Sequence, residues 1–256
     1  KLLELLDALE EADTSRRAAQ IDKDGNVTLS SEIPAGKPAA EKSAEDGTGE
    51  SQPLYMSLNH VMEYYIFAYY FQPATEVRCT DIPYGEYYRT YGQLALSMQK
   101  YNGAKKAYER AIAWNPVDLD AYLGLAEVYK YQNQREKYLT VTRQAYRYCC
   151  TRATMARYYR NMAFYYLSGY EPETARACYQ YSNVYYHTEN ADSELKYISE
   201  AIQQETPQTD IRAIQKLFDE KQIEPGPDSQ TIGIVYKVGE ILLKDGDYKL
   251  AKDCYS

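Results

Sequence analysis

The chain has 256 residues, of which 30 are Tyr, and its 37 acidic and 29 basic residues give a net charge of −8. This acidic balance argues against nucleic-acid binding, because neutralising phosphates requires clustered Lys and Arg. No apolar run approaches the roughly 18 residues of a membrane span. A Tyr ring fills a core only where its hydroxyl reaches water or a partner, so the composition predicts thin layers of helices with much half-buried surface.

The N-terminal part of the sequence predicts one helix followed by an irregular segment. Leucines recur at helical spacing over residues 1–20, which predicts an amphipathic N-terminal helix. A Gly-Asn pair between short β-prone runs predicts that residues 21–53 begin as a hairpin-like loop. Residues 34–53 contain no Leu, Ile, Val or aromatic residue, so we expect a flexible linker there.

Helical signals dominate the rest of the chain. Residues 54–72 are predicted to form one helix that stops before Pro73. We expect residues 54–84 as a whole to be a helical region that caps the N-terminal end of the fold. The helical patterns then continue without a long interruption from residue 85 to the end of the chain.

The segment from residue 85 to 116 has the spacing of two helices that cross closely. Small residues are needed where the helices cross, aromatic rings wedge against neighbouring helices, and a Pro ends the second helix. With Gly85 as position 1, the matching residues are Tyr88 (position 4), Gly92 (8), Ala104 (20), Tyr108 (24), Ala111 (27) and Pro116 (32). In this pattern the segment resembles the tetratricopeptide repeat, a helix–turn–helix unit of 34 residues.

Further copies of the pattern begin at residues 119, 156, 194 and 232. We predict an array of about five units over residues 85–256, the fourth degenerate and the last incomplete, because the chain stops inside its second helix. That ending predicts a longer native chain or a partner that covers the last unit. The resemblance, to bacterial proteins of this type, implies an all-α fold: a right-handed α-solenoid of helix–turn–helix units with an N-terminal helical extension.

The resemblance also implies where a partner binds. In such arrays the concave face comes mainly from first-helix positions 2, 5, 6, 9, 12 and 13, and members with a carboxylate clamp bind C-terminal peptides through Lys, Arg and Asn there. The match is partial, because Gly124 stands where a clamp Asn is expected, and a solvated face bearing Arg is the alternative. The predicted partner-binding residues are Arg89, Gln93, Glu127, Lys130, Tyr131, Arg157, Arg160 and Asn161.

No catalytic constellation stands out in the sequence. The histidines are only His60 and His187, and there is no HExxH, GxSxG, P-loop or GxGxxG motif. The adjacent Cys149 and Cys150 are interpreted as space-filling thiols, with a redox role as the alternative. We therefore predict that the protein is not an enzyme and uses no cofactor.

No metal site is predicted either. The spacing of Asp22, Asp24 and Asn26 is similar to that of the first ligands of a calcium loop. Such a loop requires a bidentate Glu at its twelfth position, where this sequence has Ile33. We therefore interpret the segment as a turn.

Together these patterns favour a protein–protein interaction scaffold that binds a partner protein or peptide in the groove of the array. The alternatives are a Tyr-lined receptor for small molecules or glycans and a self-assembly module, such as a homodimer. Five cysteines without a CxxC motif or a disulfide-dense spacing predict a reducing compartment, the cytoplasm. The chain begins with Lys1 rather than Met, which leaves room for an upstream targeting segment.

Overall fold

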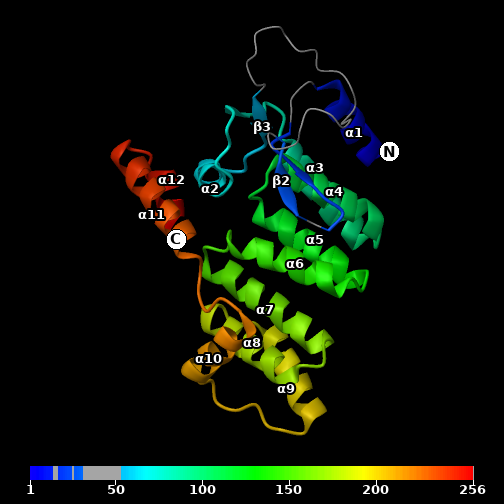
Figure 1. Ribbon diagram of the computed structural model, residues 1–256, viewed down its shortest axis with the longest axis vertical. Coiled ribbons are helices and arrows are strands. Elements are labelled where there is room, and N and C mark those ends of the chain that lie inside the picture. Colours follow the sequence, from blue (N-terminus) through cyan, green and yellow to red (C-terminus); the bar gives the residue numbers. More distant parts are fainter. Residues whose placement is uncertain (14–16, 25, 31–52, 256) are drawn as a thin grey trace. The chain divides into compact units, whose positions relative to one another are not determined.

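Helix–turn–helix pairs make up most of the structure, a computed structural model that describes residues 1–13, 17–24, 26–30 and 53–255 (Figure 1). The chain divides into a first unit, Lys1–Asn133, and a second unit, Gln134–Ser256. The predicted linker over residues 34–53 lies outside the described residues except for its last residue.

The N-terminal extension contains a short β-hairpin. The helix predicted over residues 1–20 is α1 (Leu2–Ala12), and the prediction is wrong at residues 19 and 20, which lie in a strand. Strand β1 (Ala19–Ile21) instead pairs antiparallel with β2 (Val27–Leu29). The backbone groups of these residues form the hydrogen bonds of this strand pair. The leucine spacing of the preceding residues did not indicate that pairing.

The turn between these strands is held by one side chain. Asp22 Oδ1 accepts hydrogen bonds from the backbone N–H groups of Asp24 (2.8 Å) and Asn26 (2.9 Å), and Asp22 Oδ2 accepts one from the Asn26 amide (2.9 Å). An Asp that bonds the backbone two residues on is typical of an Asx turn. The interpretation of this segment as a turn is confirmed.

The region that precedes the repeats combines one helix with a pair of parallel strands. Strand β3 (Leu54–Met56) pairs with β4 (Val77–Cys79), and α2 (Val61–Phe71) lies between them in the chain. The helix predicted over residues 54–72 therefore begins only at Val61. Its first residues are in a strand because their backbone groups pair with residues more than twenty positions away, a contact that local periodicity does not show.

The first unit contains the best-formed repeat. Helix α3 (Tyr84–Ser97) packs along α4 (Tyr101–Trp114), and α5 (Leu119–Tyr131) packs on both of them (Figure 1). Trp114 is fully buried at the end of α4, and its ring stacks on that of Tyr84 with 4.6 Å between centroids. The core of this unit is thus built from large rings and small Ala and Gly residues.

Helix α1 attaches to this unit through its acidic side. Tyr84 donates a hydrogen bond to Asp13 Oδ2 (2.7 Å) and Tyr88 donates one to Glu10 Oε2 (2.6 Å). Leu2, Leu5 and Leu9 share the other side and remain exposed. The helix therefore turns Asp7 and Glu10 toward the protein and Leu2, Leu5 and Leu9 outward.

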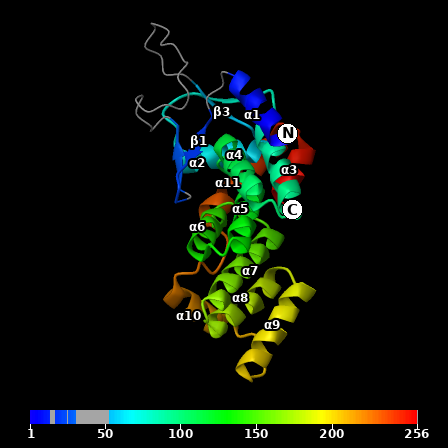
Figure 2. The same cartoon turned by 90° about the vertical axis from the view of Figure 1, so that its right-hand side faces the viewer.

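The second unit begins with α6 (Arg135–Tyr146), which packs on α7 (Arg152–Ser168). Helix α7 forms a close pair with α8 (Pro172–Tyr185), and α11 (Ser229–Lys244) forms another with α12 (Tyr248–Tyr255). Figure 2 shows α7, α8 and α9 in succession within this unit. The remaining helices, α9 (Glu189–Ile202) and α10 (Ile211–Lys221), both pack on α8.

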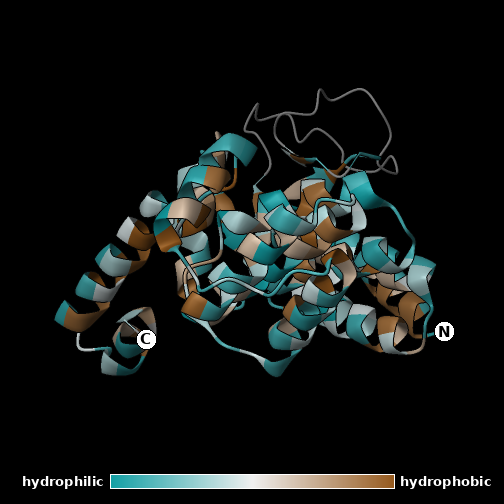
Figure 3. Ribbon diagram, turned by 90° about the horizontal axis from the view of Figure 1, so that it is seen from below, coloured by the Kyte–Doolittle hydropathy of each residue, from teal (hydrophilic) through white to brown (hydrophobic). Residues whose placement is uncertain are grey.

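Successive helix pairs confirm the all-α helical-repeat fold predicted from the sequence. Hydrophobic and hydrophilic residues lie side by side along the helices, as Figure 3 shows by colour, which is typical of helices that bury one face. The fourth pair differs from the others, because α9 and α10 each pack on α8 instead of forming a close pair. The two small two-stranded sheets belong to the N-terminal extension.

Candidate functional site

Arg89 lies in an ion pair that holds two repeats of the first unit together. Its Nη1 atom lies 3.0 and 2.9 Å from the two carboxylate oxygens of Asp118, which is 1% exposed. Asp118 is also the N-cap of α5 and accepts a hydrogen bond from the backbone N–H of Ala121 (3.2 Å). Arg89, predicted to bind a partner, thus anchors the start of α5.

A second buried carboxylate lies close to this pair. Glu63 accepts hydrogen bonds from the Asn59 backbone N–H (2.7 Å), the Asn59 amide (2.9 Å) and the Asn115 amide (2.7 Å). Burial raises the pKa of Asp118, Arg89 opposes that shift, and the negative charge of Glu63 adds to it. This polar cluster ties α2 to α3 and to the turn between α4 and α5.

Gly124, where the clamp pattern expects Asn, has a packing role. A Cβ atom at Gly124 would lie 2.3 Å from the Tyr108 ring, and one at Gly92 would lie 2.9 Å from the same ring. The ring of Tyr108 therefore fits between α3 and α5 only because both residues lack a side chain. A clamp Asn at position 124 is incompatible with this packing.

The other predicted residues of the first unit lie on the outer faces of α3 and α5. Gln93 is exposed on α3, and Glu127 holds the equivalent position on α5. Lys130 Nζ lies 3.8 Å from Glu127 Oε2. Tyr131, one residue further, is 58% exposed. These four side chains lie on the first helices of consecutive repeats, which pack on each other.

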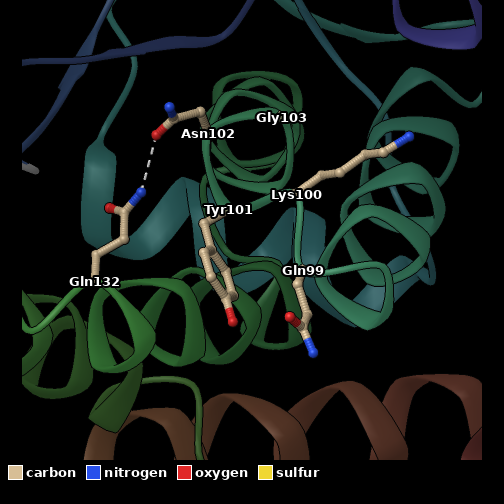
Figure 4. Close-up of a pocket in the computed structure, with 6 residues that line it drawn as sticks. All are labelled: Gln99, Lys100, Tyr101, Asn102, Gly103 and Gln132. Carbon is tan, nitrogen blue, oxygen red and sulfur yellow. Dashed lines mark hydrogen bonds between the residues drawn. The ribbon is translucent and has the colours of Figure 1, made fainter.

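A small pocket opens beside Tyr131, at the turn between α3 and α4 (Figure 4). Tyr101 lines it and stacks on Tyr131, with 5.4 Å between ring centroids and 15° between ring planes. The Gln132 amide donates a hydrogen bond of 3.0 Å to Asn102 Oδ1. The cavity measures about 320 Å³, and its lining residues are Gln99, Lys100, Tyr101, Asn102, Gly103 and Gln132.

The predicted residues of the second unit are more enclosed. Asn161 is buried, and its backbone carbonyl oxygen accepts a hydrogen bond of 3.0 Å from the Tyr138 hydroxyl of α6. Arg160 has a buried Nη1 atom that makes no hydrogen bond. Burial lowers the pKa of Arg160, and the neighbouring charge of Arg157 adds to this shift. Asn161 therefore serves the contact between α6 and α7, and Arg157 and Arg160 are half-buried on α7.

The sequence reasoning missed what a buried cluster of tyrosines on α7 and α8 binds. The Tyr159 hydroxyl donates to the Glu224 carbonyl (2.8 Å), and the Tyr158 hydroxyl donates to the Glu224 carboxylate (2.9 Å). Phe218 of α10 is fully buried between the rings of Tyr159 and Tyr181. The only available signal was the density of Tyr in these helices, which does not reveal what the hydroxyls bind.

The remaining candidate groups for chemistry are not assembled into a site. His60 is exposed, and His187 lies 2.8 Å from Asp192 at the surface. Burial raises the pKa of the Cys149 and Cys178 thiols, which keeps them in the protonated, poorly nucleophilic form. Across the described residues, no three His, Cys, Asp or Glu side chains are grouped so that they could hold a metal ion.

Within the described part of the chain, none of the helices has the length and apolar character needed to span a bilayer. A search of curated proteins returns no match to the chain. A scan of protein families matches residues 85–118 to the tetratricopeptide repeat, which is the segment that forms α3, α4 and the turn into α5. This repeat is a binding fold that generally mediates protein–protein interactions. With its successive helix pairs, the chain is a protein of the tetratricopeptide-repeat type.

Proposed function

We propose that this chain is a non-catalytic binding module, and that its first unit holds a segment of a partner protein on the outer faces of α3 and α5. The binding residues in this proposal are Gln93, Glu127, Lys130 and Tyr131. The five free cysteines support a reducing compartment such as the cytoplasm.

The observation that carries the proposal is the exposure of Tyr131 on a rigid support. An aromatic ring that is 58% exposed and stacked on Tyr101 offers a flat contact area with little loss of side-chain entropy. Tyr is among the residues that contribute most to binding energy in protein interfaces. Glu127 and Lys130 carry opposite charges beside this ring, which supports recognition of a segment that contains both signs of charge.

Arg89 and Asn161 are left out of this surface for physical reasons. Moving Arg89 onto a partner carboxylate would leave Asp118 buried without its counter-charge, which costs several kcal/mol. Asn161 is buried between α6 and α7. Arg157 and Arg160 belong to the second unit and form no part of the proposed surface.

The test compares the partners of three proteins in quantitative affinity purification from the host. They are the wild type, the double variant Tyr131→Ala with Lys130→Glu, and the control Tyr197→Ala. Tyr197 is 60% exposed on α9 of the second unit, so the control removes a ring of the same exposure. We expect partners that the wild type and the control retain and that the double variant loses.

A partner identified in this way is then titrated with the same purified proteins. Truncating an interface Tyr typically costs about 2 kcal/mol or more, a loss of roughly thirtyfold in affinity. Circular dichroism checks that the double variant keeps its helix content. If the folded double variant binds every partner as tightly as the Tyr197→Ala protein, the proposed surface is wrong.

A further inference from the structure

The pocket between the α3–α4 turn and the end of α5 is lined mainly by polar side chains. Its side chains are three amides, one Lys and one Tyr, and Gly103 contributes only backbone. No aliphatic side chain and no carboxylate is among the lining residues. The apolar contact that the lining side chains offer therefore comes chiefly from the ring of Tyr101.

We propose that this pocket binds a saccharide, with one pyranose ring against Tyr101 and its hydroxyl groups on the amides of Gln99, Asn102 and Gln132. A sugar hydroxyl both donates and accepts hydrogen bonds, and an amide side chain offers both functions. The CH groups on one face of a pyranose form an apolar patch that matches an aromatic ring. An apolar ligand would find too little hydrophobic wall here, because pockets for such ligands are lined mainly by apolar side chains.

The backbone at Gln99 and Lys100 and the ring of Tyr101 are held in place before any ligand arrives. Gln99 adopts a left-handed backbone (φ 58°), and the Lys100 N–H bonds the Ala95 carbonyl (2.8 Å), which closes the end of α3. Stacking on Tyr131 holds the ring of Tyr101. Figure 4 shows Tyr101 between Gln132 on one side and Gln99 on the other. Such preorganisation lowers the entropy cost of binding.

The volume of the pocket and the charge of its lining limit which saccharides we expect it to bind. At about 320 Å³ the cavity lies at the small end of ligand pockets, which range over roughly 300–1,000 Å³, so it accommodates one or two sugar rings of a longer chain. Lys100 is the only charged side chain in the lining. A sugar that carries a carboxylate, such as a uronic acid, should therefore bind more tightly than its neutral counterpart.

The experiment titrates the full chain with oligosaccharides and follows it by calorimetry and by amide chemical shifts. The probes are trisaccharides of glucose, mannose, xylose, N-acetylglucosamine and galacturonic acid. We expect at least one to bind and to shift the amide signals of residues 99–103 and 132. If none binds at concentrations up to about 10 mM, a range that covers even weak sites, the proposal is overturned.

Variants separate binding in the pocket from binding elsewhere. Asn102→Ala and Gln132→Ala should each weaken the saccharide about three- to tenfold, the effect of losing a neutral hydrogen bond. Asn190→Ala is the matched control, because Asn190 is an exposed Asn at the same position of the first turn in α9. Saccharide binding that all three variants leave equally strong would show that the pocket is not the site.

Three further variants test the ring and the charge. Tyr101→Phe should keep binding, whereas Tyr101→Leu should reduce it, because only Phe preserves the stack on Tyr131. Lys100→Gln should remove the preference for galacturonate over a neutral sugar and leave neutral sugars unaffected. Asn102 and Gln132 lie outside the proposed protein-binding surface, so the failure of either proposal leaves the other standing.

Discussion

Each unit attaches a further segment to a tyrosine-bearing helix, and the two units do so by different physical means. In the first unit Tyr88 meets the carboxylates of α1, around which Arg17 and Arg110 also pair with Glu10. In the second unit Glu224, which follows α10, accepts tyrosine hydrogen bonds on its backbone carbonyl and on its carboxylate, and Phe218 fills the space between the rings. One attachment is therefore mainly electrostatic and the other mainly apolar.

This contrast shows why Tyr is so abundant in the chain. A phenol ring contributes apolar area, while its hydroxyl satisfies whatever polar group lies at the edge of the packed layer. The same residue type can thus bind a carboxylate, as Tyr88 and Tyr158 do, or a backbone carbonyl, as Tyr159 does. A Phe in these places would keep the ring and lose the hydrogen bond, which costs about 0.5–1.5 kcal/mol.

The largest expected effect is the loss of the apolar attachment. Phe218→Ala should lower the free energy of unfolding of the second unit by about 3–5 kcal/mol, because it removes a fully buried ring and leaves a cavity. Urea unfolding followed by circular dichroism measures this. Tyr159→Phe, which keeps the ring and loses one hydrogen bond, should cost only about 0.5–1.5 kcal/mol. A loss for Phe218→Ala below about 1 kcal/mol would show that the attachment in the second unit is not mainly apolar.

The electrostatic attachment should be weaker and sensitive to salt. Glu10→Gln removes ion pairs with Arg17 (2.8 Å) and Arg110 (3.2 Å), and we expect α1 to detach more easily by about 1–2 kcal/mol. Hydrogen exchange of the α1 amides measures this, and about 1 M salt should weaken the wild-type attachment as well.

The control for this prediction lies on the same helix. Glu4→Gln changes a carboxylate that is 84% exposed, so it should leave the exchange of α1 unchanged. Amides of α10 should be less sensitive to salt, because the buried Phe218 holds this helix, together with the ion pair of Lys221 with Glu171. Equal salt sensitivity in α1 and α10 would remove the distinction between the two attachments.

The smallest effect concerns pH and the first unit alone. Because the pKa of Asp118 is raised in the folded state, the folded protein binds this proton more tightly than the unfolded chain does. The stability that this group contributes is thus fully present below its unfolded pKa of about 3.9, and it is lost as pH rises through the folded pKa.

Comparison with Asp118→Asn isolates that contribution. Relative to the variant, the wild type should gain stability as the pH falls from about 7 toward 4, with unfolding followed at each pH. A wild type that instead loses stability relative to Asp118→Asn on acidification would show that the ion pair with Arg89 outweighs burial and the charge of Glu63.

The repeat was predictable because its determinants are local. The small residues Gly92 and Ala104 and the ring of Tyr108 recur at fixed spacing, and these are the residues that the helix crossing needs. Strand β3 was not predictable, because Leu54 pairs with Val77 through backbone groups that carry no sequence signature. The residues around it have a helix-forming pattern, so the sequence predicted a helix where the distant pairing forms a strand.

In the candidate site too, the features set by local spacing were predicted and the contacts between distant residues were not. Tyr131 and Gln93 were placed on the surface because repeat position predicts exposure, and both are exposed. The ion pair of Arg89 was not predicted, because its partner, Asp118, lies 29 residues away across the next turn. The pocket was missed because Tyr101 and Gln132 come from different repeats, and only folding brings the two together.

The stack of Trp114 on Tyr84 also has a spectroscopic consequence. The chain contains a single Trp, and this Trp is buried in the first unit. Tyrosine rings transfer excitation to a nearby indole, so Trp114 collects light absorbed by the phenols around it. Its emission reports the opening of the first unit, while far-ultraviolet circular dichroism reports the helices of both. The unlabelled protein thus carries its own means of telling the unfolding of one unit from that of the other.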